Sequence, residues 1–402
     1  MTRAARPDSS EGCMLRASKP TWDDRVTARR PAGLVPAASS LAFDDVPILI
    51  AAAATASPSH VVDRDATRAW CRRLYEREPD LASRLRLIDH TGVERRALAL
   101  PPDRIATARG FDVRNAEYAE AALPLAEEAA RRALGRAGLA ARDLDVLLTT
   151  SCTGILIPSL AAYLAPRLGL RDDVVRLPIT ELGCAAGAAG VARAAELCRG
   201  SARVAMVLAV ELPTLTFQPG DRSMSNFVAA SLFGDGAAAV ILGAPERLPR
   251  PTGARVEVLG SRSHLFPAST RLMGFGVGDG GFQLVLARDV PEFLRGKVRP
   301  LVERLCAGEG VQPSRLGFAA IHPGGRRILA NLEEELGLPR SVTAPSWQVL
   351  AGHGNMSSAT VLFVLERVLA SAAPGDGAYG LLAAFGPGFA AEMSVLRWWA
   401  PR

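Results

Sequence analysis

The sequence of 402 residues contains little lysine, few aromatic residues and few cysteines. Lys19 and Lys297 are the only lysines among its 47 basic residues, and the rest are arginines. The net charge is +6, but no block of basic residues occurs, so a nucleic-acid partner is not expected. The six cysteines form no Cys-x-x-Cys pair and lie in no histidine-rich stretch, which argues against zinc or another metal. So few cysteines in a long chain also argue against a disulfide framework and favour the reducing cytoplasm.

Long hydrophobic runs are also missing. The apolar run at residues 46–56 is too short to cross a bilayer and predicts a buried strand, so no membrane span is expected. Charges scattered up to Arg30 leave no apolar segment typical of a secretion signal, and we expect a cytoplasmic protein. Residues 1–44 mix proline, serine, alanine and arginine without a period, which predicts a disordered or loosely attached extension.

Apolar residues make up 49% of the chain, and they follow a pattern that occurs twice. In each half a helix, an apolar strand, a helix of small residues and a second apolar strand succeed one another. This order favours an α/β fold built from two duplicated halves with buried strands. The first strand lies at 143–148 in one half and at 315–320 in the other. The small-residue helix starts at 183–187 and at 354–359, and the second strand lies at 204–210 and at 379–385.

Three polar residues fall at the ends of these elements. Cys184 and Asn355 each stand where a small-residue helix begins, and His322 follows a strand. A pseudo-twofold relation between the halves would bring them together, and the N–H groups at a helix start would stabilise a cysteine thiolate. Taken singly, each residue has an ordinary explanation: a buried thiol, a structural or surface histidine with His353 as a nearby competitor, and a helix cap.

Five short motifs occur in order along the chain. They are Gly183-Cys184-Ala185-Ala186-Gly187, Leu232-Phe233-Gly234-Asp235-Gly236-Ala237, His322-Pro323-Gly324-Gly325, Gly354-Asn355-Met356-Ser357-Ser358-Ala359 and Phe385-Gly386-Pro387-Gly388. In order and spacing they resemble the signatures of type III polyketide synthases, the chalcone-synthase-like enzymes of the thiolase superfamily. The resemblance runs from about Val46 to the C-terminus. It implies a homodimer with the five-layered αβαβα thiolase fold, whose halves would span residues 45–245 and 246–402.

The resemblance implies a role for each of the three polar residues. Cys184 would accept an acyl group from a CoA thioester and carry the growing chain. His322 would pair with its thiolate and, with Asn355, would hold the thioester carbonyl of malonyl-CoA while decarboxylation turns it into an enolate. CoA thioesters are then substrates, and neither a cofactor nor a metal nor an obligatory acyl carrier protein is implied.

A set of cavity residues is also implied by the resemblance. Phe233 would be the gate between CoA tunnel and cavity, and Ile157 would stand where plant enzymes pass a methionine into the partner subunit's cavity. Cys152 stands where plant enzymes have threonine and some bacterial members cysteine, and a pocket thiol that does not react is the favoured interpretation. The predicted substrate-binding residues are Cys152, Thr153, Ile157, Thr216, Phe233, Leu284, Ser357, Phe385, Gly386 and Pro387.

Cations are expected where the phosphates of CoA bind. Arg84, Arg86 and His90 lie on the stretch that supplies basic residues in the family, and Arg327 follows the His-Pro-Gly-Gly motif. In a sequence this rich in arginine, a solvated surface charge explains each of them as well.

Two departures from the plant pattern bear on the substrate. Leu284 replaces a second gatekeeping phenylalanine, and Ala384 precedes Phe385 where the family has glycine. Without an aromatic stop, an apolar wall favours an aliphatic acyl chain, at about 0.8 kcal/mol for each buried methylene group. Residues 271–282 have no clean alignment to the plant pattern.

The sequence therefore predicts an acyltransferase that loads an acyl-CoA, extends it with malonyl-CoA and cyclises the product to an alkylpyrone or alkylresorcinol. The alternative is a synthase that uses malonyl-CoA alone and makes a tetrahydroxynaphthalene-type aromatic, because Cys152 also occurs there. A ketoacyl-ACP synthase of the fatty-acid priming type and a non-enzymatic scaffold are more remote alternatives.

Overall fold

A mixed sheet organises the fold. The computed structural model describes residues 46–199, 203–251, 253–371 and 374–399, and the extension predicted at 1–44 lies outside these ranges. Within them, the sheet has nine strands in the order β11-β12-β13-β8-β1-β7-β6-β4-β5. Their bounds are β1 (Leu49–Ala56), β4 (Val146–Thr150), β5 (Val175–Ile179), β6 (Val204–Glu211) and β7 (Gly236–Gly243) in one half, and β8 (Arg255–Leu265), β11 (Leu316–Ile321), β12 (Tyr379–Gly386) and β13 (Ala390–Trp399) in the other.

The two halves of the sheet repeat the same order of strands. β4 and β6 run parallel, with α6 (Ala186–Cys198) directly before β6, just as β11 and β12 run parallel, with α12 (Ser358–Ala370) directly before β12. The first half has an additional edge strand, β5, beside β4. Two antiparallel strands follow in each half, β7 and β1 in the first and β13 and β8 in the second. The halves join where Leu49 and Ile50 pair with Glu257 and Val256. The duplication predicted from the sequence is confirmed.

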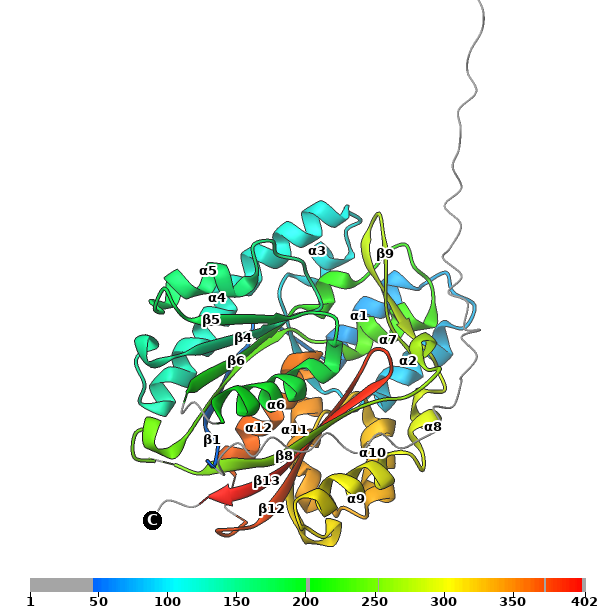
Figure 1. The fold of residues 1–402 in the computed structure, drawn as a ribbon. Coiled ribbons are helices and arrows are strands. Elements are labelled where there is room, and N and C mark those ends of the chain that lie inside the picture. Colours follow the sequence, from blue (N-terminus) through cyan, green and yellow to red (C-terminus); the bar gives the residue numbers. More distant parts are fainter. Residues whose placement is uncertain (1–45, 200–202, 252, 372–373, 400–402) are drawn as a thin grey trace, which may run out of the picture. The chain divides into compact units, whose positions relative to one another are not determined.

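Helices cover the outer faces of the two half-sheets and fill the space between them. α4 (Phe111–Ala137) and α5 (Leu160–Leu168) share a buried cluster with the first half, and α9 (Val298–Gly308) and α10 (Arg326–Leu336) share one with the second. A third cluster joins α6 and α12 to strands of both halves, so these two helices lie between the half-sheets (Figure 1). The layers therefore follow the order α-β-α-β-α of the predicted thiolase-like fold.

Burial on both faces explains the composition of the central strands. Every residue of β6 and β7 is buried, and both strands are almost wholly apolar, as expected for strands enclosed by helices on both sides. The apolar run predicted at 46–56 contains β1, which is mostly buried. The edge strand β5 is instead exposed along most of its length.

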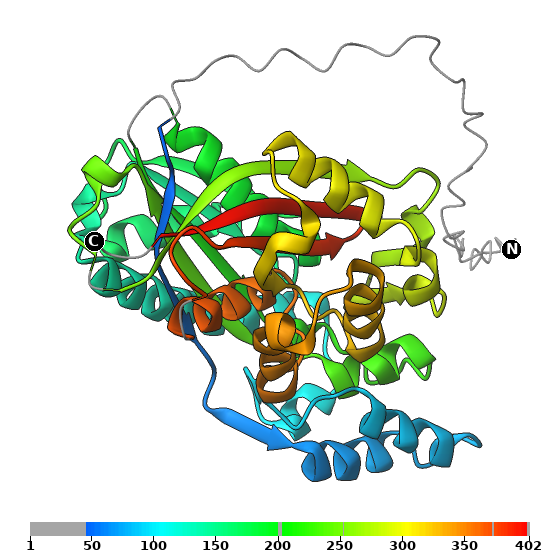
Figure 2. The same cartoon turned by 90° about the horizontal axis from the view of Figure 1, so that it is seen from below.

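A smaller group of elements borders the end of the molecule at which α6 and α12 begin. α1 (Arg64–Leu74), α2 (Leu81–His90) and α7 (Met224–Leu232) share a further apolar cluster. β1 leads from the large sheet to β2 (His60–Asp63) and α1 (Figure 2). No helix in the described ranges is both long and apolar enough to cross a membrane. The remaining elements are β3 (Arg95–Leu98), β9 (Met273–Gly278), β10 (Gly281–Leu286), α3 (Pro102–Ala106), α8 (Val290–Leu294) and α11 (Arg340–His353).

The two central helices approach each other at a glycine. A Cβ atom at Gly187 would lie 2.2 Å from the carbonyl oxygen of Ser358 and 2.8 Å from Cγ1 of Val361. No side chain fits in that space, so glycine at this position sets the separation of α6 and α12. The small residues after Cys184 thus have a packing role in the centre of the fold.

We expect Gly187→Ala to destabilise the protein by about 1–3 kcal/mol or more, because the methyl group overpacks a backbone contact. Gly135→Ala is the matched control, since Gly135 lies inside α4 and a Cβ there meets no atom within 4 Å. That change is expected to stabilise the helix by about 0.5–1 kcal/mol. Thermal unfolding of both variants would measure the difference, and equal midpoints would show that the two helices can separate at little cost.

Candidate active site

The starts of α6 and α12 and the end of β11 converge on one cavity. Its volume is about 550 Å³, and Cys184, His322 and Asn355 all line it. Cys184 lies in the 3-10 turn Gly183–Ala185 that precedes α6, while Asn355 stands shortly before α12 and His322 directly after β11. The structure thus brings together the three residues that the duplicated pattern predicted to meet.

Asn355 is held in one orientation, whereas His322 is free to bind. Asn355 Oδ1 accepts hydrogen bonds from the Ser357 backbone N–H at 2.8 Å and from the Thr360 hydroxyl at 3.4 Å, and its Nδ2 donates to the Gly324 carbonyl at 3.3 Å. Asn355 also hydrogen-bonds the Cys184 side chain, which acts to lower the pKa of that thiol, so the second Nδ2 proton faces the sulfur. His322 is 2% exposed, yet neither of its ring nitrogens has a hydrogen-bond partner among the residues that the structure describes. Buried polar atoms are normally satisfied, so these nitrogens suit a bound oxygen or thiol.

The surroundings favour the neutral thiol and the neutral imidazole. Burial raises the pKa of Cys184 to about 11, although Ser357, whose hydroxyl lies 3.6 Å from the sulfur, acts in the opposite direction. Burial also lowers the pKa of His322 to about 4. The thiolate expected at the helix start is therefore opposed by a larger effect of burial. A neutral imidazole is the form that can accept the proton of a thiol.

The depressed pKa of His322 predicts a loss of stability in acid. As the pH falls from 6.5 towards 4, the unfolded imidazole binds a proton that the folded one does not, so the free energy of unfolding decreases by about 3 kcal/mol for this group. His322→Gln removes this titration, and chemical denaturation between pH 7 and pH 4 should show a weaker pH dependence than in the parent. His60→Gln, at an exposed site, serves as the control. Equal slopes in all three proteins would contradict the prediction.

A buried carboxylate that the sequence analysis missed, Glu211, lies beside Cys152. Its Oε2 accepts hydrogen bonds from the Thr153 hydroxyl at 2.8 Å and from the Cys152 backbone N–H at 3.1 Å. Cys152 Sγ lies 3.3 Å from the Ser357 hydroxyl, the same group that contacts Cys184. Burial raises the pKa of both Glu211 and Cys152. An acidic residue that ends an otherwise apolar strand was the signal that could have identified Glu211.

Most of the predicted substrate-binding residues line the cavity, but three do not. Ile157 is 90% exposed, and Thr216 lines a separate void of about 10 Å³ that Thr153 also borders. Gly386 packs against the turn before Cys184, since a Cβ there would lie 2.4 Å from the Leu182 carbonyl oxygen. The predicted residues that do line the cavity are Cys152, Thr153, Phe233, Leu284, Ser357, Phe385 and Pro387.

The β9–β10 hairpin supplies an aromatic side chain that the sequence analysis did not place. Phe275 pairs with Leu284 across the two strands, and both residues line the cavity. The aromatic group missing at Leu284 is therefore present on the opposite strand of the same wall. This weakens the argument for a long aliphatic substrate, which depended on the absence of an aromatic stop.

Two of the four basic residues expected to bind CoA lie at the cavity, His90 and Arg327. Arg84 is buried elsewhere: its guanidinium donates to Asp80 at 2.6 Å and to the Arg222 carbonyl at 2.8 Å. It stabilises the loop beside α2 and does not face the cavity. Arg86 is exposed and donates to a neighbouring serine. The cavity is lined by two further arginines that the sequence analysis did not single out, Arg288 and Arg326.

One known protein family matches almost the whole of the described chain. The family of chalcone and stilbene synthases matches through its N-terminal domain at residues 44–246 and its C-terminal domain at residues 257–399.

Individual relatives agree with this result. The chain is 41% identical over 351 residues to 1,3,6,8-tetrahydroxynaphthalene synthase of Streptomyces peucetius subsp. caesius, an alignment that covers 87% of this chain and 93% of the relative. It is 35% identical over 345 residues to phloroglucinol synthase of Pseudomonas fluorescens, covering 85% and 97%. Among solved structures, 1,3,6,8-tetrahydroxynaphthalene synthase of Streptomyces coelicolor A3(2) matches with a TM-score of 0.83 and 34% identity, over 87% of this chain and 99% of that one.

Proposed function

The chain belongs to the chalcone and stilbene synthase family of type III polyketide synthases, and from this premise we propose that it condenses malonyl-CoA units on Cys184 and cyclises them to a tetrahydroxynaphthalene-type aromatic. The observation that carries the proposal is the single cavity in which Cys184, His322 and Asn355 meet. Membership of this family of acyltransferases also sets aside the ketoacyl-ACP synthase and the scaffold.

Loading begins at the thiol. His322 accepts the proton of Cys184, and the sulfur attacks the thioester carbonyl of the first CoA substrate, from which CoA leaves as a thiol after taking up a proton. The resulting acyl-enzyme carries the starter on Cys184. The neutral state of both groups in the structure makes this proton transfer possible without a prior change of charge.

Extension needs an enolate of malonyl-CoA. When the bond to the carboxylate breaks, carbon dioxide leaves and the electron pair moves onto the thioester oxygen. There the Nδ2 proton that Asn355 directs towards Cys184 and an N–H of His322 stabilise the negative charge. The enolate carbon then attacks the acyl group on Cys184, a carbon–carbon bond forms, and the thiolate leaves. The extended chain, now on CoA, returns to Cys184 for the next cycle.

The residues that line the cavity are compatible with a short starter and a polyketide chain. Phe275 and Leu284 pair across the hairpin and contribute an aromatic and an aliphatic group to one wall. Cys152, Thr153 and Ser357 add hydrogen-bonding groups to the lining. A polyketide chain carries a carbonyl on every second carbon, and such groups can orient it before ring closure. The tetrahydroxynaphthalene and phloroglucinol synthases among the relatives support an aromatic product.

An alkylpyrone or alkylresorcinol remains the second candidate, because Leu284 in place of an aromatic gate leaves an aliphatic patch in the wall. Purified protein should be incubated with malonyl-CoA, alone and with acyl-CoAs from acetyl to palmitoyl, and the products identified by mass spectrometry. The proposal predicts one aromatic product from malonyl-CoA alone. Products that appear only with added acyl-CoA, and that lengthen with it, would establish the second candidate instead.

Exposed apolar side chains support the homodimer that we propose. Ile157 is 90% exposed, Ile155 is also exposed, and the edge strand β5 presents Val175 and Leu177 to solvent. An interface would bury such side chains. Light scattering should give twice the mass of the chain, and a monomer would refute the dimer.

His90, Arg326 and Arg327 line the cavity, and we propose that they bind the phosphates of CoA.

A further inference from the structure

The β9–β10 hairpin forms a wall of the cavity, but little within it holds it in place. Leu284 pairs with Phe275 and Leu286 with Met273, and all four side chains line the cavity. Neither strand joins the large sheet. The hairpin tip, residues 278–281, has the sequence Gly-Asp-Gly-Gly and so offers almost no side-chain packing. Its position must depend on contacts from outside the hairpin.

The side chain of Gln218, which lies outside the hairpin, contacts the tip. Gln218 Nε2 donates to the carbonyl oxygens of Gly280 at 3.0 Å and Phe282 at 2.9 Å. A Cβ atom at Gly280 would lie 2.6 Å from Gln218 Oε1, so the backbone of the tip packs directly against the amide. We refer to these contacts of Gln218 with the carbonyls of Gly280 and Phe282 as the Gln218 latch.

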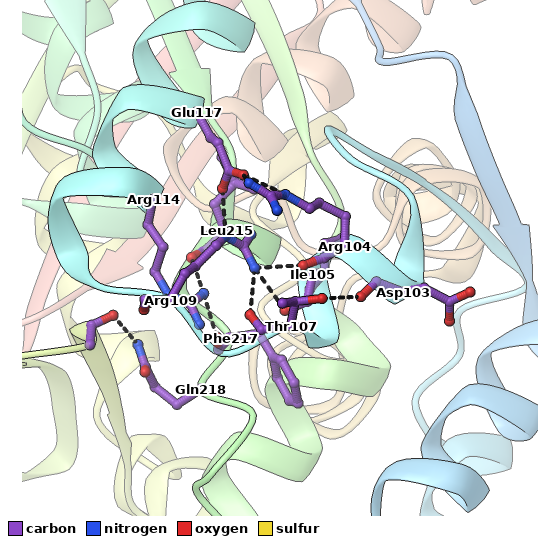
Figure 3. A network of polar contacts seen from close by, with 11 residues as sticks. Asp103, Arg104, Ile105, Thr107, Arg109, Arg114, Glu117, Leu215, Phe217 and Gln218 are labelled. Carbon is purple, nitrogen blue, oxygen red and sulfur yellow. Dashed lines mark hydrogen bonds and ion pairs between the residues drawn. The ribbon is translucent and has the colours of Figure 1, made fainter.

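Buried groups fix Gln218 itself. Asn226 binds both of its backbone groups, because Asn226 Oδ1 accepts from the Gln218 N–H at 3.2 Å and Asn226 Nδ2 donates to its carbonyl at 2.8 Å. Arg114 donates to the carbonyls of Leu215 at 3.0 Å and Phe217 at 2.7 Å, just before Gln218. Figure 3 shows the contacts of Arg114 with Leu215 and Phe217 beside Gln218, together with the neighbouring residues Asp103, Arg104, Ile105, Thr107, Arg109 and Glu117.

The start of α4 supports the tip from a second side. The Phe111 backbone N–H donates to the Asp279 carbonyl at 3.1 Å, and the ring of Phe111 meets that of Phe282 edge-on at 5.4 Å. Gly281 has a φ of +102°, and a Cβ there would lie 3.1 Å from the Phe111 ring. The tip thus lies between Phe111 and Gln218. Gln218 holds it through side-chain hydrogen bonds, which a substitution can remove without taking an aromatic ring out of the contact with Phe282.

We propose that Gln218 is a specificity-determining residue: by fixing the hairpin tip, it holds the Phe275–Leu284 wall towards Cys184 and limits the length of the acyl chain that the cavity accepts. The effect on chain length rests on the proposed function, whereas the latch does not. Gln218 does not line the cavity and therefore acts through the wall. Releasing the latch should widen the range of starters and leave the decarboxylation of malonyl-CoA unchanged.

Gln218→Glu tests the proposal with almost no change of shape. A carboxylate has no proton to donate, and it would face the carbonyl oxygens of Gly280 and Phe282 as well as that of Thr216, to which Nε2 also donates at 3.2 Å, so the latch is lost. Gln283→Glu adds the same charge to the exposed side of β10 and serves as the matched control. We expect the backbone amides of residues 273–286 to exchange hydrogen about tenfold faster in Gln218→Glu, and the ratio of hexanoyl-primed to malonyl-only product to rise by about the same factor. Gln218→Ala should act in the same direction.

Each other outcome overturns the inference. Unchanged exchange in Gln218→Glu would show that the latch does not hold the tip, and faster exchange with unchanged products would show that the wall does not select chain length. Equal changes in both Glu variants would assign the effect to charge alone. If the parent protein neither decarboxylates malonyl-CoA nor forms a polyketide, the proposed function fails, while hydrogen exchange still tests the latch separately.

Discussion

Cys184→Ala is expected to abolish polyketide formation, with a loss of roughly 10⁴-fold or more, while the protein still decarboxylates malonyl-CoA. The thiol of Cys184 is needed to carry the acyl group through each condensation. Decarboxylation needs only the two donors that stabilise the enolate, and these remain in place. Product yield by mass spectrometry and release of carbon dioxide, measured on the same sample, separate the two steps.

The control for this prediction is another cysteine on the same helix. Cys198 is buried at the far end of α6 and does not line the cavity, so Cys198→Ala should retain polyketide formation. If Cys184→Ala kept full product formation, the nucleophile would have to be another residue, and Cys152, which shares the Ser357 hydroxyl with Cys184, would be the first to examine.

Asn355→Ala is expected to slow decarboxylation itself by about 10²–10³-fold, the usual cost of removing one donor from a charged oxygen in a site of this kind. Asn355 is oriented by Ser357 and Thr360, so its Nδ2 is directed without any rearrangement when the enolate forms. His322→Ala should have an effect of similar size, because its ring supplies the second donor. The measurement is the initial rate of carbon dioxide release from malonyl-CoA.

A second asparagine provides the comparison for Asn355. Asn331 lies on α10 and does not itself line the cavity, although it donates at 3.1 Å to the carbonyl of Pro291, which does. Because Asn331 lies outside the group formed by Cys184, His322 and Asn355, Asn331→Ala should decarboxylate malonyl-CoA at the parental rate. If Asn355→Ala and Asn331→Ala decarboxylate malonyl-CoA at the same rate, Asn355 takes no part in the mechanism. Its role would then be to stabilise the structure around α12.

Much of the architecture could be predicted because it depends on patterns within short segments. Strands buried on both faces leave continuous apolar runs, and helices packed in the centre need small residues, as the close contact at Gly187 illustrates. Two such sets in one chain predicted the duplication. The convergence of Cys184, His322 and Asn355 followed from it, since equivalent elements end at the same place in the fold.

Side-chain environment was harder to predict, because it depends on contacts between distant segments. Arg84 is basic and lies on the expected helix. Its guanidinium is nevertheless buried, because it donates hydrogen bonds to Asp80 and to the carbonyl of Arg222, which lies far along the chain. Phe275 enters the cavity wall only through the register of a glycine-rich hairpin that has no clear alignment. Glu211 stands at the end of an apolar strand, and its partners come from other segments.

The central claim is that Cys184 carries the growing chain, and the most direct test is to find the acyl group on the protein. Purified protein should be incubated briefly with malonyl-CoA, quenched in acid and digested, and its cysteine-containing peptides examined by mass spectrometry. We predict an acyl group on the peptide that contains Cys184, and none on the peptides that contain Cys152 or Cys198. Acylation of Cys152 alone, or polyketide formation with Cys184 always unmodified, would contradict the account.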